Sequence, residues 1–208
     1  MASDHSSESS FLDASKAFDR VVHSGLFIKL LERNTPKCLI DILIAWYGNL
    51  FCRVRWDGHF TDWFKITAGV RQGGVLSPDL YSIYVDNLIC ILQSSGIGCH
   101  VGRVFAACFF YADDMCVIAP SMRGLQKLLN LCGTYCDQWD IGLNAKKTKN
   151  MIFGKKTHPQ HQLELNGKCI DWVTEWKYLG VVLKSGPKFG CSIVERVKSF
   201  YRALNAIL

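Results

Sequence analysis

The sequence lacks several features that mark particular classes of protein. No apolar run approaches the roughly 20 residues that a membrane-spanning helix needs, and the N-terminus has no charged-then-apolar signal segment. The ten cysteines include no Cys-x-x-Cys pair with the spacing of a zinc site, and no segment is repeated. We therefore expect a soluble intracellular protein with reduced thiols, in the nucleus or the cytoplasm, and we exclude membrane-spanning, disulfide-framed and zinc-ribbon classes.

Composition describes an ordinary globular chain. Its 208 residues are enough for one or two domains with a sizeable core. Hydrophobic residues make up 49% and aromatic residues 12%, which excludes a disordered chain. The net charge of +6 favours an anionic partner such as nucleic acid. Composition says nothing about the oligomeric state.

The chain is organised around the stretch from Cys108 to Ala119, in which two apolar runs flank Asp113 and Asp114. Apolar runs interrupted in this way predict a β-hairpin with both acids at the turn. Two carboxylates about 4 Å apart repel by about 4 kcal/mol at an effective dielectric near 20. A divalent metal removes this cost, and Mg²⁺ prefers oxygen ligands. A plain polar turn is the alternative interpretation.

Capping residues predict the helices. Thr35-Pro36 and Ser77-Pro78 each supply an N-cap followed by proline at the first helical position. Ser121 is expected to cap a second long helix that stops at Gly142. A further helix is expected near the C-terminus, over residues 191–208, and a serine-rich leader over residues 1–10 is predicted to be disordered.

Turn residues predict the strands. Asp57-Gly58 and Asn166-Gly167 are typical of tight hairpins, and Trp176 to Leu183 is predicted to form one strand. Hairpins combined with two long helices indicate an α+β fold, in which helices back one face of an antiparallel sheet. In such a sheet a strand at Phe11 could lie beside the acid hairpin and bring Asp13 to the same sheet edge. Three carboxylates there can hold two divalent metals for phosphoryl transfer, although Asp13 alone could be a surface acid.

Five short motifs occur in order: FLDASKAFD at 11–19, GVRQGGVLSP at 69–78, YADD at 111–114, GLNAKKTK at 142–149 and WKYLG at 176–180. Together they resemble the reverse transcriptase domain of non-LTR (long interspersed type) retrotransposons, from Phe11 onward. The resemblance implies a polymerase palm at 11–155, a primer-grip hairpin and strand at 156–190, and the start of a thumb helix at 191–208. The strands of the fingers that precede the first acid motif in this family are absent, and the leader at Ser6 to Ser10 stands where a strand would lead into Asp13.

The resemblance also implies roles for individual residues. Asp13, Asp113 and Asp114 match the catalytic acids that hold two Mg²⁺ ions, with Mn²⁺ as the alternative. The other matches are Phe18, which blocks a ribose 2′-hydroxyl, Gln72 and Gly73, which contact nucleotide and template, Lys147, which meets the departing pyrophosphate, and the primer grip formed by Trp176, Lys177, Tyr178, Leu179 and Gly180.

Each of these roles has a structural alternative. Phe18 could be a core aromatic, Gly73 could serve a tight turn, and Lys147 could belong to a solvated basic loop in which a neighbouring lysine acts instead. Asp19 is interpreted as structural. Arg53, Arg55 and Arg71 could meet phosphate, but charges on an exposed hairpin are usually solvated.

The implied function is RNA-directed DNA polymerisation, the transfer of a nucleotide from a deoxynucleoside triphosphate to a primer 3′-hydroxyl. An RNA template and a DNA primer are the implied partners. The alternative is a catalytically inactive retrotransposon-derived remnant that binds nucleic acid only. A palm without fingers lacks half of the preorganised charge that such catalysis uses.

Overall fold

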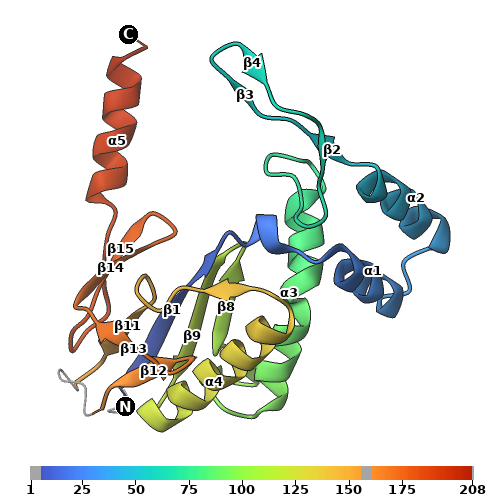
Figure 1. Cartoon of the computed structure of the whole chain (residues 1–208). Helices are drawn as coiled ribbons and strands as arrows, with labels where there is room; N and C mark the ends of the chain where they lie inside the picture. The colour runs from blue at the N-terminus through green and yellow to red at the C-terminus, as the bar shows by residue number, and fades with distance from the viewer. Residues whose placement is uncertain (1–5, 156–160, 208) are drawn as a thin grey trace.

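A seven-stranded sheet forms the centre of the computed structural model, which describes residues 6–155 and 161–207 (Figure 1). The strand order is β12–β13–β11–β1–β9–β8, and β10 also pairs with β1. All pairs are antiparallel except β11 with β13. This confirms the predicted sheet. The strands are β1 (Ser7–Ser15), β8 (Cys108–Tyr111), β9 (Asp114–Ala119), β10 (Gly142–Leu143), β11 (Lys149–Phe153), β12 (Leu163–Leu165) and β13 (Lys168–Trp172).

The strand β1 corrects the prediction of a disordered leader, which is wrong for Ser7 to Ser10. These residues pair with β11 on one side and β9 on the other. Small serine side chains fit this interior position, and the Ser10 hydroxyl donates to Asn150 Oδ1 across the sheet. Asp13 is therefore held by a complete strand. Residues 1–5 of the predicted leader lie outside the described residues.

Two helices cover one face of the sheet. α3 (Ser77–Ser94) and α4 (Met122–Gln138) pack on Leu12, Met115 and Val117 to form the main core. The Ser121 side chain accepts a hydrogen bond from Gly124 N at 3.2 Å, which confirms the predicted cap of α4. The predicted stop at Gly142 is wrong, because the helix ends at Gln138 and Gly142 pairs with Ser15 in the sheet.

A second, three-stranded sheet covers the opposite face. It consists of β14 (Glu175–Tyr178), β15 (Val181–Lys184) and β16 (Gly190–Ser192) and packs on Phe11, Cys116 and Met151. The prediction of one strand from Trp176 to Leu183 is wrong, because the chain reverses at Leu179-Gly180. Both turn residues have positive φ, 47° and 78°. The Asn166-Gly167 hairpin is confirmed as β12–β13.

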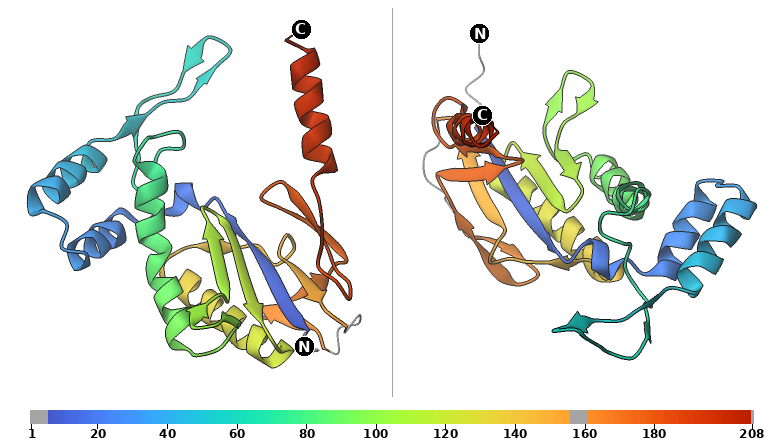
Figure 2. Two further views of the ribbon diagram at one scale, coloured as in Figure 1. Left: turned by 180° about the vertical axis from the view of Figure 1, so that it is seen from behind. Right: turned by 90° about the horizontal axis from the view of Figure 1, so that it is seen from above.

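Some of the remaining elements join the core and others project from it (Figure 2). The helices that begin at His23 and Lys37 bury Leu26, Leu30 and Ile40 in the main core. The chain between residues 51 and 65 forms a long hairpin, here called the arm, and its tip confirms the predicted Asp57-Gly58 turn. α2 begins at Lys37 with Pro36 as its N-cap, one residue later than predicted. The elements are η1 (Phe18–Arg20), α1 (His23–Glu32), α2 (Lys37–Gly48), β2 (Phe51–Cys52), β3 (Arg55–Trp56), β4 (His59–Phe60), β5 (Phe64–Lys65), β6 (His100–Val101), β7 (Val104–Phe105) and α5 (Val194–Asn205).

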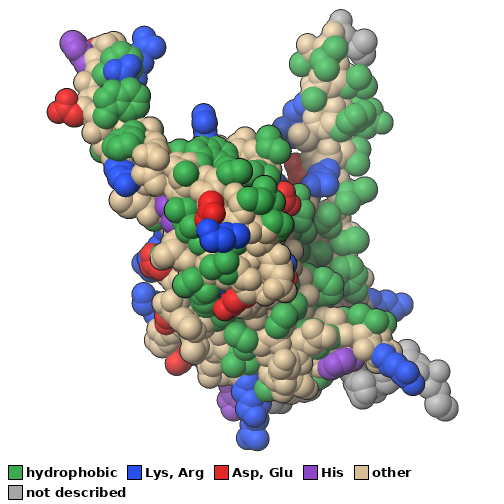
Figure 3. Space-filling model, turned by 90° about the vertical axis from the view of Figure 1, so that its right-hand side faces the viewer, with side chains coloured by type: hydrophobic (Ala, Val, Ile, Leu, Met, Phe, Trp, Pro, Cys, Tyr) green, Lys and Arg blue, Asp and Glu red, His purple; other side chains and the backbone are tan. Residues whose placement is uncertain are grey.

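The arm and α5 rise as two separate projections from the same end of the molecule, with the core below them (Figures 1 and 3). α5 fits the predicted helix near the C-terminus. All ten cysteines lie in the described part of the chain and are free thiols. Within that same part, no helix is long and apolar enough to cross a membrane.

Candidate active site

The strand period brings two of the predicted acids together. Asp13 lies directly opposite Asp114 in the β1–β9 ladder. Because alternate strand residues share a face, Asp13 lies on the same side as Phe11, which packs against the β14–β16 sheet. Asp113 lies in the turn between β8 and β9, beside Ala112, whose φ is 52°. The predicted hairpin is therefore confirmed, but only Asp113 lies in its turn, because Asp114 is the first residue of β9 and pairs with Tyr111. Asp13 lies in β1, which is an interior strand of the sheet.

Asp114 lies in an environment that disfavours its charged form. The pKa of Asp114 is raised, first by burial and then by the nearby charges of Asp113 and Asp13. Asp13 Oδ2 is buried and accepts no hydrogen bond from any residue in the described ranges. Lys147 forms an ion pair with that oxygen, its Nζ lying 3.8 Å away. A buried carboxylate oxygen without a donor is a costly arrangement that a bound cation would relieve.

The chemistry of this group suits a divalent metal, because carboxylate oxygens are the ligands that Mg²⁺ prefers. The orphaned Asp13 oxygen and the mutual repulsion at Asp114 both fit such a use. Among the described residues, however, no three His, Cys, Asp or Glu side chains form a group that could hold a metal ion. The donor types fit, but the three acids do not form a closed group in this structure.

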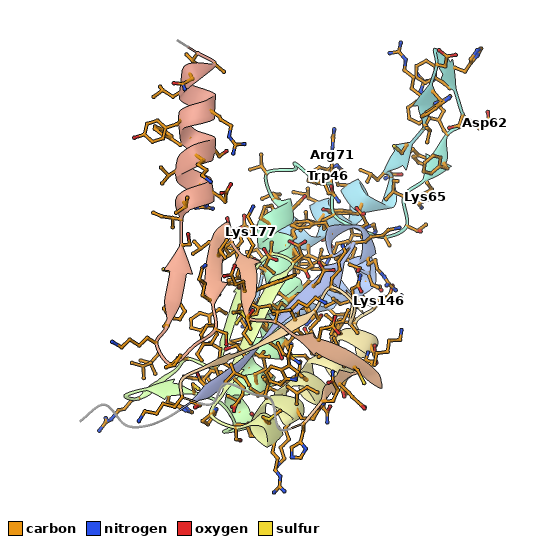
Figure 4. All side chains as sticks on the ribbon, turned by 90° about the vertical axis from the view of Figure 1, so that its left-hand side faces the viewer. Trp46, Asp62, Lys65, Arg71, Lys146 and Lys177 are labelled. Carbon is orange, nitrogen blue, oxygen red and sulfur yellow. The ribbon has the colours of Figure 1, made fainter. Side chains whose placement is uncertain are left out.

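Part of the predicted primer grip lies over the acids. Trp176, Lys177 and Tyr178 line a small cavity of about 40 Å³ together with Asp13 and Asp114, and Lys147 lines it too. Lys177 is labelled in Figure 4. The residues that line the cavity come from four separate stretches of the chain.

Tyr178 connects the grip sheet to the acid hairpin. Its hydroxyl donates to the carbonyl oxygens of Phe109 at 3.3 Å and Asp114 at 3.5 Å. Its ring packs on Phe11, with 5.1 Å between ring centroids. Burial, with smaller contributions from Cys116 and Asp114, raises the pKa of its hydroxyl, which therefore stays protonated as a donor.

Leu179 and Gly180 lie apart from this cavity. They form the β14–β15 turn, where Arg196 of α5 donates to the Leu179 carbonyl at 2.8 Å. The guanidinium of Arg196 lies where a Cβ on Gly180 would be. These two residues therefore connect the grip sheet to α5 rather than to the acids.

The predicted nucleotide-side residues occupy a neighbouring region. Phe18 stacks on Tyr81, with 5.0 Å between ring centroids, and is half-buried against the main core. Gln72 Nε2 donates to Asp19 Oδ1 at 3.2 Å, and both residues line a separate pocket of about 710 Å³ at the base of the arm. Gly73 has a φ of 80°, in the left-handed region that favours glycine.

Sequence reasoning missed the residues that hold the Asp13 backbone. Asn144 N donates to Asp13 O at 3.0 Å, and Asp13 N donates to Thr148 Oγ1 at 3.4 Å. Both residues belong to the motif at 142–149, so the signal was present. Their partner, however, lies more than 130 residues away in the sequence.

Comparison with known proteins identifies the family. Residues 2–183 match the family described as "Reverse transcriptase (RNA-dependent DNA polymerase)". The chain belongs to this family. Divalent metal ions are used generally in reverse transcriptases, and members of the family bind nucleic acid.

Similar curated proteins come from non-LTR retrotransposons. The chain is 34% identical over 198 residues to the "RNA-directed DNA polymerase from mobile element jockey" of Drosophila funebris, covering 92% of this chain and 21% of that protein. It is 30% identical over 206 residues to the "Probable RNA-directed DNA polymerase from transposon BS" of Drosophila melanogaster, covering 95% of this chain and 22% of that protein. The chain thus spans about a fifth of the length of these relatives. Both matches confirm the resemblance found from the motifs.

Solved telomerase structures share the fold. Apo telomerase from Candida tropicalis, truncated from its C-terminal domain, superposes with a TM-score of 0.65 at 15% identity, covering 90% of this chain and 35% of that one. Telomerase from Candida albicans in complex with a fragment of telomeric RNA gives 0.56 at 14% identity, covering 87% of this chain and 30% of that one. These neighbours support a polymerase-palm fold.

Proposed function

We propose that the acid site is the catalytic centre of an RNA-directed DNA polymerase that adds deoxynucleotides to a primer 3′-hydroxyl on an RNA template. The observation that carries this proposal is the cavity in which Asp13 and Asp114, paired across β1 and β9, lie under Trp176, Lys177 and Tyr178. A chain end held by the grip would lie against the acids. The family relation supports the same reaction.

The acids Asp13, Asp113 and Asp114 would hold Mg²⁺, in two ions, with Mn²⁺ able to replace it. Metal bound there supplies positive charge that activates the attacking hydroxyl oxygen and stabilises the leaving one. The raised pKa of Asp114 supports this role, because a bound cation would offset both the burial and the nearby charges of Asp113 and Asp13 that raise it. A rearrangement of these side chains would have to bring the three carboxylates into one group.

The chain's other residues would position the reactants. Lys147, with its ammonium 3.8 Å from Asp13 Oδ2, would meet the negative charge that develops on the departing pyrophosphate. Phe18, fixed by its stack on Tyr81, would exclude a ribose 2′-hydroxyl. Gln72, from the pocket that it shares with Asp19, and the adjacent Gly73 would contact nucleotide and template.

Domain boundaries belong to the same proposal. Residues 11–155 would act as the palm, 156–190 as the primer-grip region and 191–208 as the beginning of a thumb. Residues 156–160, where palm and grip would meet, lie outside the described residues. The contact of Arg196 with Leu179 supports a thumb helix that moves with the grip sheet.

Primer extension tests the proposal. The wild-type chain, an Asp113→Asn, Asp114→Asn double variant and an Asp62→Asn control on the arm are compared on a primed RNA template with Mg²⁺ or Mn²⁺ and deoxynucleotides. We expect extension by the wild type and the control, and at least about a 1000-fold loss in the double variant, which equals about 4 kcal/mol of lost transition-state stabilisation. Nucleic-acid binding without extension by a folded wild type would favour the inactive-remnant alternative.

A further inference from the structure

The β1 strand has an interrupted neighbour at the position of Asp13. On the side of β1 that faces away from β9, Phe11 pairs with Lys149 in β11, and Ala14 pairs with Leu143 in β10. The five residues 144–148 therefore stand opposite only Leu12 and Asp13. The chain leaves the ladder here as a bulged turn, a device that re-aims side chains beside active sites. We call residues 144–148 the acid turn; Lys146, one of its residues, is labelled in Figure 4.

The acid turn supplies the hydrogen bonds that a regular strand would have supplied. Asn144 N donates to the Asp13 carbonyl at 3.0 Å. The Asp13 N–H would be left without a partner on this side, but it donates to the hydroxyl of Thr148 at 3.4 Å. That hydroxyl donates in turn to the Asn144 carbonyl at 2.9 Å. Thr148 is fully buried, so water is not a ready substitute.

Leaving the ladder allows Lys147 to reach the acid. The Asn144 side chain accepts from the backbone N–H groups of Lys146 at 3.1 Å and Lys147 at 3.4 Å, which closes the turn. Lys147 then places its Nζ 3.8 Å from Asp13 Oδ2. If a backbone carbonyl had to satisfy Asp13 N–H, residue 148 would stay in the strand and the turn would be lost. The threonine hydroxyl gives the Asp13 N–H an acceptor and still lets the chain form the turn that carries Lys147.

We propose that Thr148 is a positioning residue that fixes the Asp13 backbone and so sets the affinity of the acids for a divalent cation, without touching the cation itself. The proposal rests on the proposed function, because it takes Asp13 to be a metal ligand. Residues that orient a ligand typically change metal affinity by about 10- to 100-fold when they are removed. Thr148 acts through one long hydrogen bond, so we expect the lower end of that range.

The test measures Mn²⁺ binding by electron paramagnetic resonance of the free ion, with no nucleic acid present. Thr148→Val keeps the volume but removes the hydroxyl, and we expect it to bind Mn²⁺ about 10-fold more weakly. Thr148→Ser keeps the hydroxyl and should stay within about 2-fold of wild type. Asp13→Asn should lose at least about 10-fold. Circular dichroism verifies that each variant is folded.

The outcomes separate the two proposals. If Asp13→Asn binds Mn²⁺ as well as wild type, the proposed metal site is wrong. If Asp13→Asn loses affinity while folded Thr148→Val does not, or if Thr148→Ser loses as much as Thr148→Val, the positioning role is wrong and the metal site stands. Should Thr148→Val fail to fold, Asn144→Ala, which opens the turn, replaces it. That variant must then weaken Mn²⁺ binding while Asn144→Ser, which keeps an acceptor oxygen, does not.

Discussion

Leu128 in α4 and Trp56 at the tip of the arm are both large apolar residues, but their surroundings are opposite. Leu128 is completely buried beneath the central sheet, whereas Trp56 is 82% exposed. The arm holds further exposed aromatic residues, Phe60 and Trp63. The guanidinium of Arg53 lies 3.9 Å and 4.8 Å from their ring centroids, and the guanidinium of Arg55 lies 5.7 Å from the centroid of Phe60. Figure 3 shows such apolar side chains on both projections of the molecule.

The difference shows what tertiary packing adds to a hairpin. The acid hairpin β8–β9 and the arm are both antiparallel pairs with strong turn signals. β9 is enclosed by β1 and by α4, so it buries Met115, Cys116 and Val117. Among the residues that the structure describes, no such layers bury the aromatic side chains of the arm. Isolated two-stranded hairpins are marginally stable, and apolar surface exposed in this way promotes association.

The largest expected effect comes from breaking the well-packed region. Leu128→Ala should lower the free energy of unfolding by about 2–5 kcal/mol, because it removes buried methyl groups and leaves a cavity. The matched control is Leu39→Ala in α2, where the leucine is half exposed, and its change should stay within about 1 kcal/mol. Urea denaturation monitored by circular dichroism measures both. Equal losses at the two positions would contradict the contrast between core and periphery.

Lys29 is a buried charged residue of α1 that contacts the core. Its Nζ is buried, donates to Tyr135 Oη at 2.6 Å and lies 3.8 Å from the centroid of the Trp139 ring. Burial lowers its pKa from 10.5 to about 8, with a smaller opposing effect of Glu32. Lys29→Met removes the buried charge at similar volume. The free energy of unfolding at pH 7 should therefore decrease by less than about 1.5 kcal/mol, or should increase.

The difference in stability between wild type and Lys29→Met should depend on pH with a defined sign. Between pH 8 and pH 10.5 the unfolded chain keeps the Lys29 proton that the folded chain has lost. Stability therefore rises with pH across this window. Wild type should gain stability relative to Lys29→Met as the pH rises from 7 to 10, and urea denaturation at four pH values measures the difference. A difference that does not change with pH would show that Lys29 is not desolvated in the folded protein.

The smallest expected effect on stability lies on the arm. Trp56→Ser removes an exposed side chain and should change the free energy of unfolding by less than about 0.5 kcal/mol. Self-association should nevertheless decrease, because the exposed apolar area decreases. Analytical ultracentrifugation across protein concentrations measures this, with His59→Ser at the same tip as a polar control. Unchanged self-association of Trp56→Ser would mean that the exposed apolar surface of the arm does not mediate it.

Local sequence signals predicted the elements whose causes are local. The Asp-Asp hairpin, the Asn166-Gly167 hairpin and the Ser121 cap each depend on residues a few positions apart, and all are confirmed. The five ordered motifs were sufficient to indicate the family, because each is a short run of residue types in a fixed order. The same local reasoning failed at Ser7 to Ser10, whose polar side chains gave no sign of a buried strand.

The sequence by itself determined which acids, turns and motifs this chain carries, because these depend on residue type and near-neighbour spacing. Only the tertiary structure decided that Asp13 pairs with Asp114, that Ser10 is buried against Asn150, and that Thr148 supports Asp13. These contacts join positions about 100 or more residues apart. They form only when β1 enters the sheet between β9 and β11, and no periodicity within one segment encodes which strands will become its neighbours.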